Sequence, residues 1–247
     1  MALVVWVYAG GGDTEAVGIL PFLRSNLLNC TFELRSPKPK PGPRPGKVIY
    51  DGRTGRSLIS EIRSDIQHFW DSSADIVILV DDVDDDDPDN REQALRNAAL
   101  ESIRAKIQNQ QGGRIPTITV CLAVPEVEIW LLADWSNTFG VSFSFCEWAA
   151  KRELVARGVD FDHPERFGVR DERGRYANKI SDIIKEVILL KCEDKRTRLG
   201  MKYSKATDTP DLLRHADPAA ISRKCKYFRR FWTVINPLCG AARGTRA

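Results

Sequence analysis

The sequence predicts an α/β protein with a mainly parallel sheet flanked by helices and a helical C-terminal extension. Over the first 140 residues, short apolar runs rich in strand-forming side chains alternate with segments of helical periodicity. Such alternation is typical of a doubly wound, Rossmann-like parallel sheet. After Trp135 the pattern changes to helices and loops without a clear strand. We therefore expect an α/β domain over residues 1–140 and a helical extension over residues 141–247 that packs on it.

The first half supplies four expected strands and four expected helices. Residues 3–8 form a continuous apolar run that predicts a buried first strand, and Asp13 or Thr14 is suited to cap the helix that follows. Pro21 is expected to kink that helix or to mark its true start. The proline-rich, basic stretch over residues 36–47 predicts an extended loop of polyproline character. The expected strands cover residues 3–8, 31–34, 76–80 and 115–124, and the expected helices cover residues 15–28, 57–70, 91–110 and 126–134.

The second half predicts helices alone. Segments with apolar residues at helical spacing cover residues 146–157, 178–191, 210–215 and 219–235, and residues 240–247 are expected to be a loose tail.

Composition limits the possible functions. The net charge of +3 is small, but residues 195–247 hold 13 lysines and arginines against three acids, while residues 81–89 hold seven aspartates. This asymmetry suggests an acidic, cation-loaded pocket beside a basic surface that could attract a polyanion, although a solvated basic helix face is the alternative. The glycines at residues 10–12 lack the spacing of a dinucleotide site or a P-loop.

The cysteines and the apolar runs predict a cytoplasmic protein. Six cysteines without a CxxC pair and three distant histidines argue against a zinc site, and we expect reduced thiols. Residues 1–8 lack the basic start of a signal peptide, and no apolar stretch approaches the ~20 residues of a membrane span.

Acidic residues follow three of the expected strands. Asp13 and Glu15 follow the first, the aspartates from Asp81 follow the third, and Glu126 with Glu128 follow the fourth. Because the carboxyl ends of parallel strands share one edge, these groups should converge and bind one or two divalent cations. Each cluster also has a simpler explanation, as a hydrated loop or as first-turn acids favoured by a helix dipole.

Three segments together resemble a known family. They are the glycine turn over residues 10–14, the sequence Asp82-Val83-Asp84, and residues 125–134, which read PEVEIWLLAD. Their order resembles Toprim-fold proteins of the OLD type, in particular small stand-alone Toprim-like proteins encoded beside ABC/SMC-type ATPases in bacterial anti-phage systems. Short motifs at residues 163–165, 203–205 and 227–231 are also similar to that family.

The resemblance implies a Toprim-type endonuclease that uses Mg²⁺ or Mn²⁺, with two ions, to hydrolyse DNA or RNA as the toxin-like effector of a partner ATPase. An oligomer is possible. The catalytic positions carried over are Ala9, Asp82, Asp84, Glu128 and Lys205. The metal ligands carried over are Asp81, Asp82, Asp84, Glu126 and Glu128. The residues expected to contact nucleic acid are Lys38, Lys40, Arg44, Lys47, Lys202, Tyr203 and Lys205.

Ala9 departs from the family pattern, because a catalytic glutamate usually follows the first strand. The alanine has three explanations. The glutamate was deliberately substituted, or Asp13 or Glu15 takes over its role, or the protein is a natural pseudo-enzyme. The alternative function is therefore a non-catalytic subunit that binds nucleic acid or the ATPase through a degenerate site. A topoisomerase- or primase-like function ranks last.

Overall fold

The computed structural model describes residues 2–43, 46, 48–108, 113–168, 172, 178–192 and 202–239, except the side chains of residues 13–16. A four-stranded sheet with the order β2-β1-β5-β6 forms its centre, and every neighbouring pair is parallel. The strands are β1 (Leu3–Ala9), β2 (Cys30–Ser36), β5 (Ile76–Asp82) and β6 (Thr117–Ala123). The predicted α/β class with a parallel sheet is confirmed.

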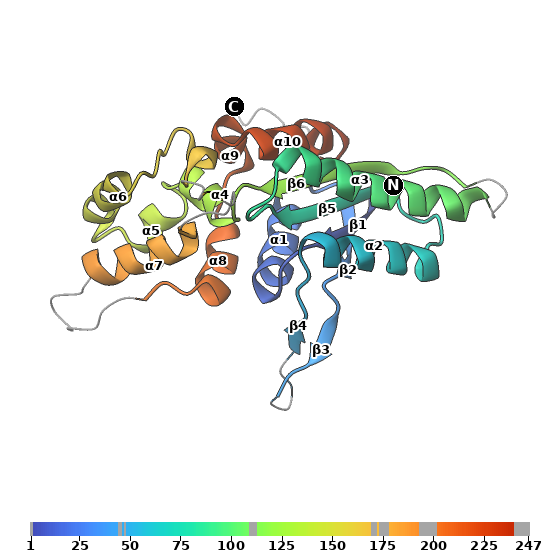
Figure 1. Cartoon of the computed structure of the whole chain (residues 1–247), viewed down its shortest axis with the longest axis horizontal. Coiled ribbons are helices and arrows are strands. Elements are labelled where there is room, and N and C mark those ends of the chain that lie inside the picture. The colour runs from blue at the N-terminus through green and yellow to red at the C-terminus, as the bar shows by residue number, and fades with distance from the viewer. Residues whose placement is uncertain are drawn as a thin grey trace.

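Helices cover both faces of this sheet, as expected for central strands that are apolar on both sides. α2 (Gly55–Phe69) and α3 (Pro88–Gln108) pack on the face that carries Trp6, Tyr8 and Leu79. α1 (Asp13–Asn26) and α10 (Lys226–Cys239) pack on the opposite face. Figure 1 shows these helices around the sheet.

The C-terminal half is helical and shares its core with the sheet. Its helices are α4 (Glu128–Ala133), α5 (Phe139–Ser142), α6 (Glu147–Ala156), the 3-10 helix η1 (Pro164–Arg166), α7 (Ile180–Lys191), α8 (Lys205–Leu213) and α9 (Pro218–Lys224). One apolar cluster runs from the α1 and α10 face of the sheet through α4 to α6, α7 and α9. The helical extension therefore packs on the sheet through a common core, and the division at residue 140 stays a prediction.

Three local expectations differ from the structure. Pro21 lies inside α1, which begins at Asp13, so this proline does not mark the start of the helix. Within the proline-rich stretch, β3 (Pro39–Pro41) pairs antiparallel with β4 (Val48–Tyr50), and Figure 1 shows the resulting hairpin projecting from the body. The single helix expected over residues 219–235 is two helices, because Cys225 between α9 and α10 is extended.

Four of the six cysteines are paired, so the expectation of reduced thiols is wrong for them. Cys30 pairs with Cys239 and Cys146 with Cys192, at Cα separations of 5.8 and 5.2 Å. These separations are typical of disulfides. The partners stand 209 and 46 residues apart in sequence, so their spacing gave no signal of a pair. Cys121 and Cys225 are free and buried.

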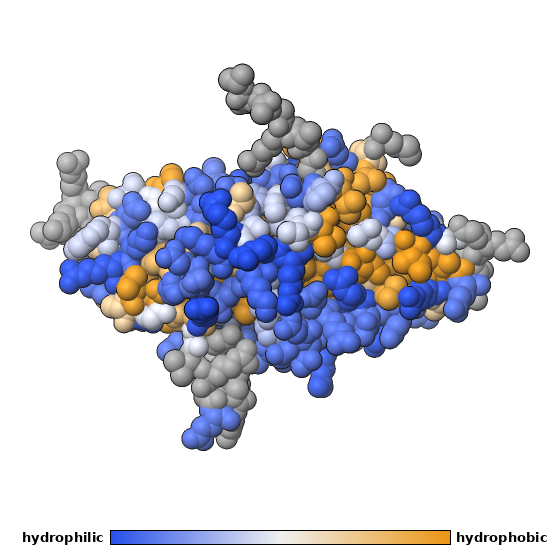
Figure 2. Space-filling model, turned by 90° about the horizontal axis from the view of Figure 1, so that it is seen from above, coloured by the Kyte–Doolittle hydropathy of each residue, from blue (hydrophilic) through white to orange (hydrophobic). Residues whose placement is uncertain are grey.

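The surface is mostly hydrophilic on the face drawn in Figure 2, with apolar side chains gathered on the half toward the C-terminal end of α3. Among the residues that the structure describes, no helix is long and apolar enough to cross a membrane.

A buried aspartate ties α2 to the first two strands. Asp65 accepts a hydrogen bond from the Tyr8 hydroxyl at 2.9 Å and another from Arg35 Nε at 2.9 Å. Lys38 Nζ lies 2.8 Å from its second oxygen. Burial by itself would raise the pKa of Asp65, but the bonds from Arg35, Lys38 and Tyr8 outweigh it and hold the pKa below its ordinary value.

We predict that Asp65→Asn lowers the free energy of unfolding by about 3 kcal/mol at pH 7, because the largely buried Arg35 loses its counter-charge. A carboxyl group whose pKa is lowered on folding stabilises the protein above its unfolded pKa of about 3.9. That stabilisation is lost as the pH falls through the folded-state pKa, so the difference between the two proteins should shrink in acid.

Urea unfolding of both proteins, at pH 7 and at a pH below 3.9, measures this difference. Asp51→Asn is the matched control, because Asp51 pairs with Lys40 on the exposed hairpin and its loss should leave the unfolding free energy almost unchanged. An equal loss at both pH values for Asp65→Asn would contradict the prediction.

Candidate functional site

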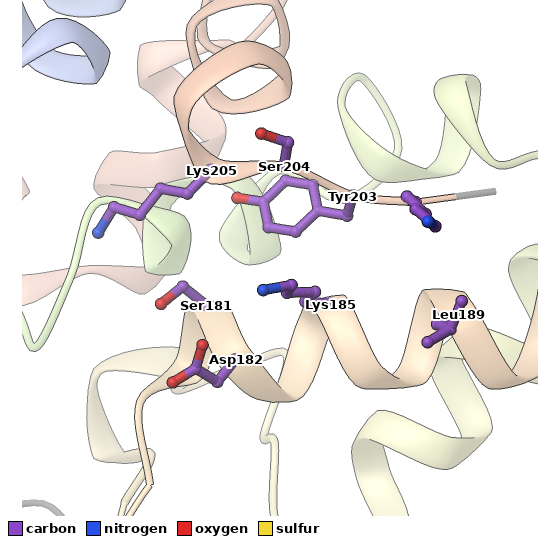
Figure 3. Close-up of a pocket in the computed structure, with 8 residues that line it drawn as sticks. Ser181, Asp182, Lys185, Leu189, Tyr203, Ser204 and Lys205 are labelled. Atoms are coloured by element: carbon purple, nitrogen blue, oxygen red, sulfur yellow. The ribbon is translucent and has the colours of Figure 1, made fainter.

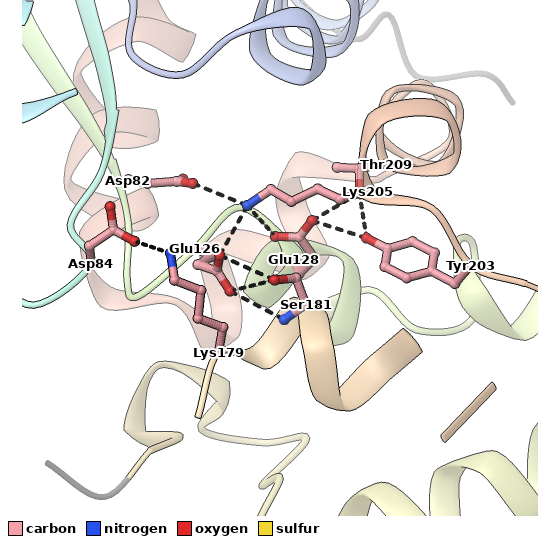
Figure 4. Close-up of polar contacts among 9 residues, drawn as sticks. All are labelled: Asp82, Asp84, Glu126, Glu128, Lys179, Ser181, Tyr203, Lys205 and Thr209. Carbon is pink, nitrogen blue, oxygen red and sulfur yellow. Dashed lines mark hydrogen bonds and ion pairs between the residues drawn. The ribbon is translucent and has the colours of Figure 1, made fainter. Parts of the chain in front are cut away.

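Three carboxylates from separate segments meet at the carboxyl edge of the sheet. Asp82 is the last residue of β5, Glu126 lies in the loop after β6, and Glu128 is the first residue of α4. All three surround the ammonium of Lys205, the first residue of α8. Lys205 Nζ lies 3.5 Å from Asp82 Oδ2, 3.1 Å from Glu126 Oε1 and 3.2 Å from Glu128 Oε2 (Figure 4). We call Asp82, Glu126, Glu128 and Lys205 the carboxylate–lysine cluster.

The cluster is largely shielded from water, which strengthens its charges. The side chain of Glu128 is fully buried, and that of Glu126 is 4% exposed. Burial opposes the charge on Lys205, but Asp82, Glu128 and Glu126 outweigh this and raise the pKa of Lys205. Burial would likewise raise the pKa of Glu126, yet Lys205 and the hydrogen bonds from Ser181 hold it below its ordinary value. Lys205 and Glu126 are therefore both charged at neutral pH.

Hydroxyl groups orient the two glutamates. Ser181, near the start of α7, donates from its backbone N–H and from its hydroxyl to Glu126, at 3.2 and 3.0 Å to Oε2. The Tyr203 hydroxyl and Thr209 Oγ1 donate to Glu128 Oε1 at 3.0 and 2.9 Å. These donors fix the orientation of both carboxylates.

Tyr203 is held inside the protein. It is 2% exposed, and burial, followed by the charge of Glu128, raises its pKa. Its hydroxyl is therefore directed at Glu128, away from solvent, which makes Tyr203 a positioning residue for that carboxylate. The contact between Tyr203 and nucleic acid stays a prediction, and Tyr203 lines a cavity (Figure 3).

Asp81 lies on the other face of the sheet from Asp82, because successive strand residues alternate. Its Oδ2 accepts from the backbone N–H of Gly55 at 3.1 Å and from Arg91 Nη1 at 3.0 Å. Burial raises the pKa of Asp81 to about 7, against the opposing effects of Arg91 and Gly55. The structure thus places Asp81 beside α2 and α3 and outside the carboxylate–lysine cluster.

Asp84 lies beside the cluster and pairs with a second lysine. Its Oδ1 is 3.4 Å from Lys179 Nζ, and its backbone N–H donates to Pro125 at 3.1 Å. Its φ of +49° is a left-handed conformation, which aspartate tolerates better than most residues. Neither Lys179 nor Ser181 was singled out from the sequence, because residues just before and inside a helix start carry no motif that marks them.

Ala9 lies on the same face of the sheet as Asp82. It is paired in register with Val80 on the neighbouring strand, and both belong to the core cluster of the α1 face. Ala9 is fully buried and ends β1 at the carboxyl edge. A longer side chain at this position would therefore start from the face that carries the carboxylate–lysine cluster.

Gly10 touches Asp81 closely. A Cβ at Gly10 would lie 2.2 Å from Asp81 Oδ1, a buried oxygen without a hydrogen-bond partner among the described residues. Only glycine allows this approach.

The described residues that were expected to bind nucleic acid have different surroundings. Lys38 pairs with Asp65 and Lys40 with Asp51, while Lys205 belongs to the carboxylate–lysine cluster. Lys202 is exposed. Arg44 and Lys47 lie outside the described residues, as do the side chains of Asp13 and Glu15.

The donors suit a hard cation by their chemistry, although their arrangement is centred on Lys205. Carboxylate oxygens are the ligands that Mg²⁺ and Mn²⁺ prefer. Within the described ranges, no group of three or more His, Cys, Asp or Glu residues is arranged to hold a metal ion. Asp82, Glu126 and Glu128 face the ammonium of Lys205, and Asp84 faces that of Lys179, so lysines supply cations to this group.

A parallel sheet covered on both faces, with charged side chains gathered at its carboxyl edge, defines an open α/β protein. Within this class, residues 34–236 match the family model described as Domain of unknown function (DUF4276), and the chain belongs to that family. The matched residues include the whole carboxylate–lysine cluster, and Ala9 precedes them. No curated protein and no solved structure matches the chain.

We predict that Lys205→Met lowers the free energy of unfolding by about 3 kcal/mol, because three largely buried carboxylates lose their shared cation. Mn²⁺ should then raise the melting temperature of the variant more than that of the unchanged protein, since a metal ion binds the folded state alone. Thermal unfolding with and without Mn²⁺ measures both effects. Lys179→Met is the control, because its more exposed pair with Asp84 should cost less. Absence of any Mn²⁺ effect on either protein would contradict a cation site here.

We also predict that Gly10→Ala destabilises the protein, since its Cβ collides with Asp81 Oδ1. Gly12→Ala is the matched control two residues away, because its Cβ would meet no atom closer than 3.5 Å. Melting temperatures compare the two variants. A loss for Gly12→Ala as large as that for Gly10→Ala would show that the glycine turn, and not the contact with Asp81, causes the effect.

Proposed function

We propose that this chain is a divalent-metal-dependent phosphodiester hydrolase that acts on DNA or RNA. The observation that supports it best is the convergence of Asp82, Glu126 and Glu128 on one cation at the carboxyl edge of the sheet. In open α/β proteins this edge is where ligands bind. The resemblance to OLD-type Toprim proteins, which rests partly on the same acidic residues, points to the same chemistry.

The roles of the residues follow from their contacts. Asp82, Glu126 and Glu128 would hold Mg²⁺ or Mn²⁺, and Asp84 stands next to them. The metal would activate a water molecule and neutralise charge on the phosphate. Ser181 and Thr209 keep the glutamates oriented. Lys205, which lines the adjoining cavity, would stabilise negative charge on the phosphate.

The wider setting of this activity is proposed from the resemblance alone. We propose an ABC/SMC-type ATPase as the partner that controls the hydrolase, and a role in cytoplasmic anti-phage defence.

Ala9 favours a second candidate, a non-catalytic subunit. Its methyl group occupies the position where the resemblance implies a catalytic glutamate, and it offers no proton acceptor or metal ligand. A chain with this site would bind nucleic acid or the ATPase, but it would not cleave a phosphodiester bond.

We predict that Ala9→Glu increases cleavage of plasmid DNA or tRNA by about 100-fold or more, the usual contribution of a general acid or base. Ala9→Gln is the matched control of the same size, and it should stay as inactive as the unchanged chain. The gain should require Mg²⁺ or Mn²⁺ and should disappear in Ala9→Glu with Asp82→Asn. Gel assays measure the cleavage. No cleavage by Ala9→Glu, alone or with the ATPase, would favour the binding subunit.

A further inference from the structure

A cavity of about 510 Å³ lies against the carboxylate–lysine cluster. It opens between α7 and the segment that leads into α8, and Ser181 and Lys205 belong both to its wall and to the surroundings of Glu126. The residues that line it are Ser181, Asp182, Lys185, Leu189, Lys202, Tyr203, Ser204 and Lys205 (Figure 3). A ligand in this cavity would therefore meet Ser181 and Lys205, which contact the carboxylates, at one end.

The outer part of the cavity is basic. Lys185 and Lys202 are both exposed, and neither forms an ion pair within the part of the chain that the structure describes. Figure 3 shows Lys185 extending across the cavity below the ring of Tyr203, with its nitrogen toward the end where Ser181 lies. Among the lining residues that the structure describes, Asp182 is the only acid. By contrast, Lys38, Lys40 and Lys205 are all paired with carboxylates, so Lys185 and Lys202 are better placed to attract a phosphate.

The remaining walls suit the uncharged part of a nucleotide. Leu189 and the ring of Tyr203 give an apolar side, and Ser204 adds a hydroxyl. Cavities that bind small ligands measure about 300–1,000 Å³. The volume of this cavity lies within that range and suits a ligand of the size of one nucleotide. A double helix is too broad to enter, because its major groove alone is about 12 Å wide.

We infer that this cavity binds one nucleotide of a single-stranded nucleic acid, with its phosphate at Lys185 and Lys202 and the neighbouring phosphodiester at the carboxylate–lysine cluster. This inference rests on the proposed hydrolase function and narrows its substrate to single strands. Lysine contacts to phosphate do not distinguish bases, so binding should depend on salt and only weakly on sequence.

Binding of fluorescent oligonucleotides to the full chain tests the inference. The measurements use Ca²⁺ in place of Mg²⁺ to separate binding from cleavage, and they compare a single strand with the same sequence as a duplex at several salt concentrations. Lys185→Gln and Lys202→Gln should each weaken single-strand binding by about tenfold, or 1.4 kcal/mol. Each should also reduce the slope of log affinity against log salt by about 0.7. Lys106→Gln, the same charge change in the last turn of α3, should leave binding unchanged.

The results separate the inference from the function on which it rests. Stronger binding of the single strand, with losses confined to the two cavity variants, supports the inference even if Ala9→Glu never cleaves. Equal binding of duplex and single strand, or no loss in Lys185→Gln and Lys202→Gln, overturns it whatever the cleavage assay shows. If 5′-AMP displaces the oligonucleotide at a concentration similar to that at which the oligonucleotide binds, the cavity is a site for free nucleotides. That result would also overturn the inference.

Discussion

The ion pairs of Lys205 hold the carboxyl edge of the sheet and the C-terminal helices together. Three carboxylates that crowd into a mostly buried space repel one another, and without a cation each would resist ionisation. Lys205 supplies that cation from α8, while Ser181 of α7 and Thr209 of α8 supply hydrogen bonds. Charge, in addition to apolar packing, thus fixes how the helical half meets the sheet.

The ammonium of Lys205 also lies at the boundary between two environments. On one side it contacts the three carboxylates, and on the other it lines the cavity that Lys185 and Lys202 border. In the proposed hydrolase, a metal ion would compete with this ammonium for the same carboxylate oxygens.

Much of the fold could be predicted from the sequence because the signals were local. The apolar run before Asp81 predicted β5, and the parallel topology predicted that acids after different strands would meet. The sequence favoured Asp82 and Asp84 over Asp81 as metal ligands, and strand alternation explains why Asp81 lies apart from Asp82. Lys179 and Ser181 carried no signal, since their role depends on where α7 packs. The disulfide partners and the β3–β4 hairpin likewise depend on tertiary contacts that spacing does not encode.

The alternation at the end of β5 makes the length of this strand critical. Asp81 faces Arg91 and Asp82 faces Lys205 only because the pleat directs neighbouring side chains to opposite sides. Removal of one residue upstream within β5 would exchange the partners of Asp81 and Asp82. It would also turn every apolar side chain between the deletion and Asp81 to the opposite face of the sheet. An insertion or deletion in this one strand would therefore disrupt both the site and the core in a single step.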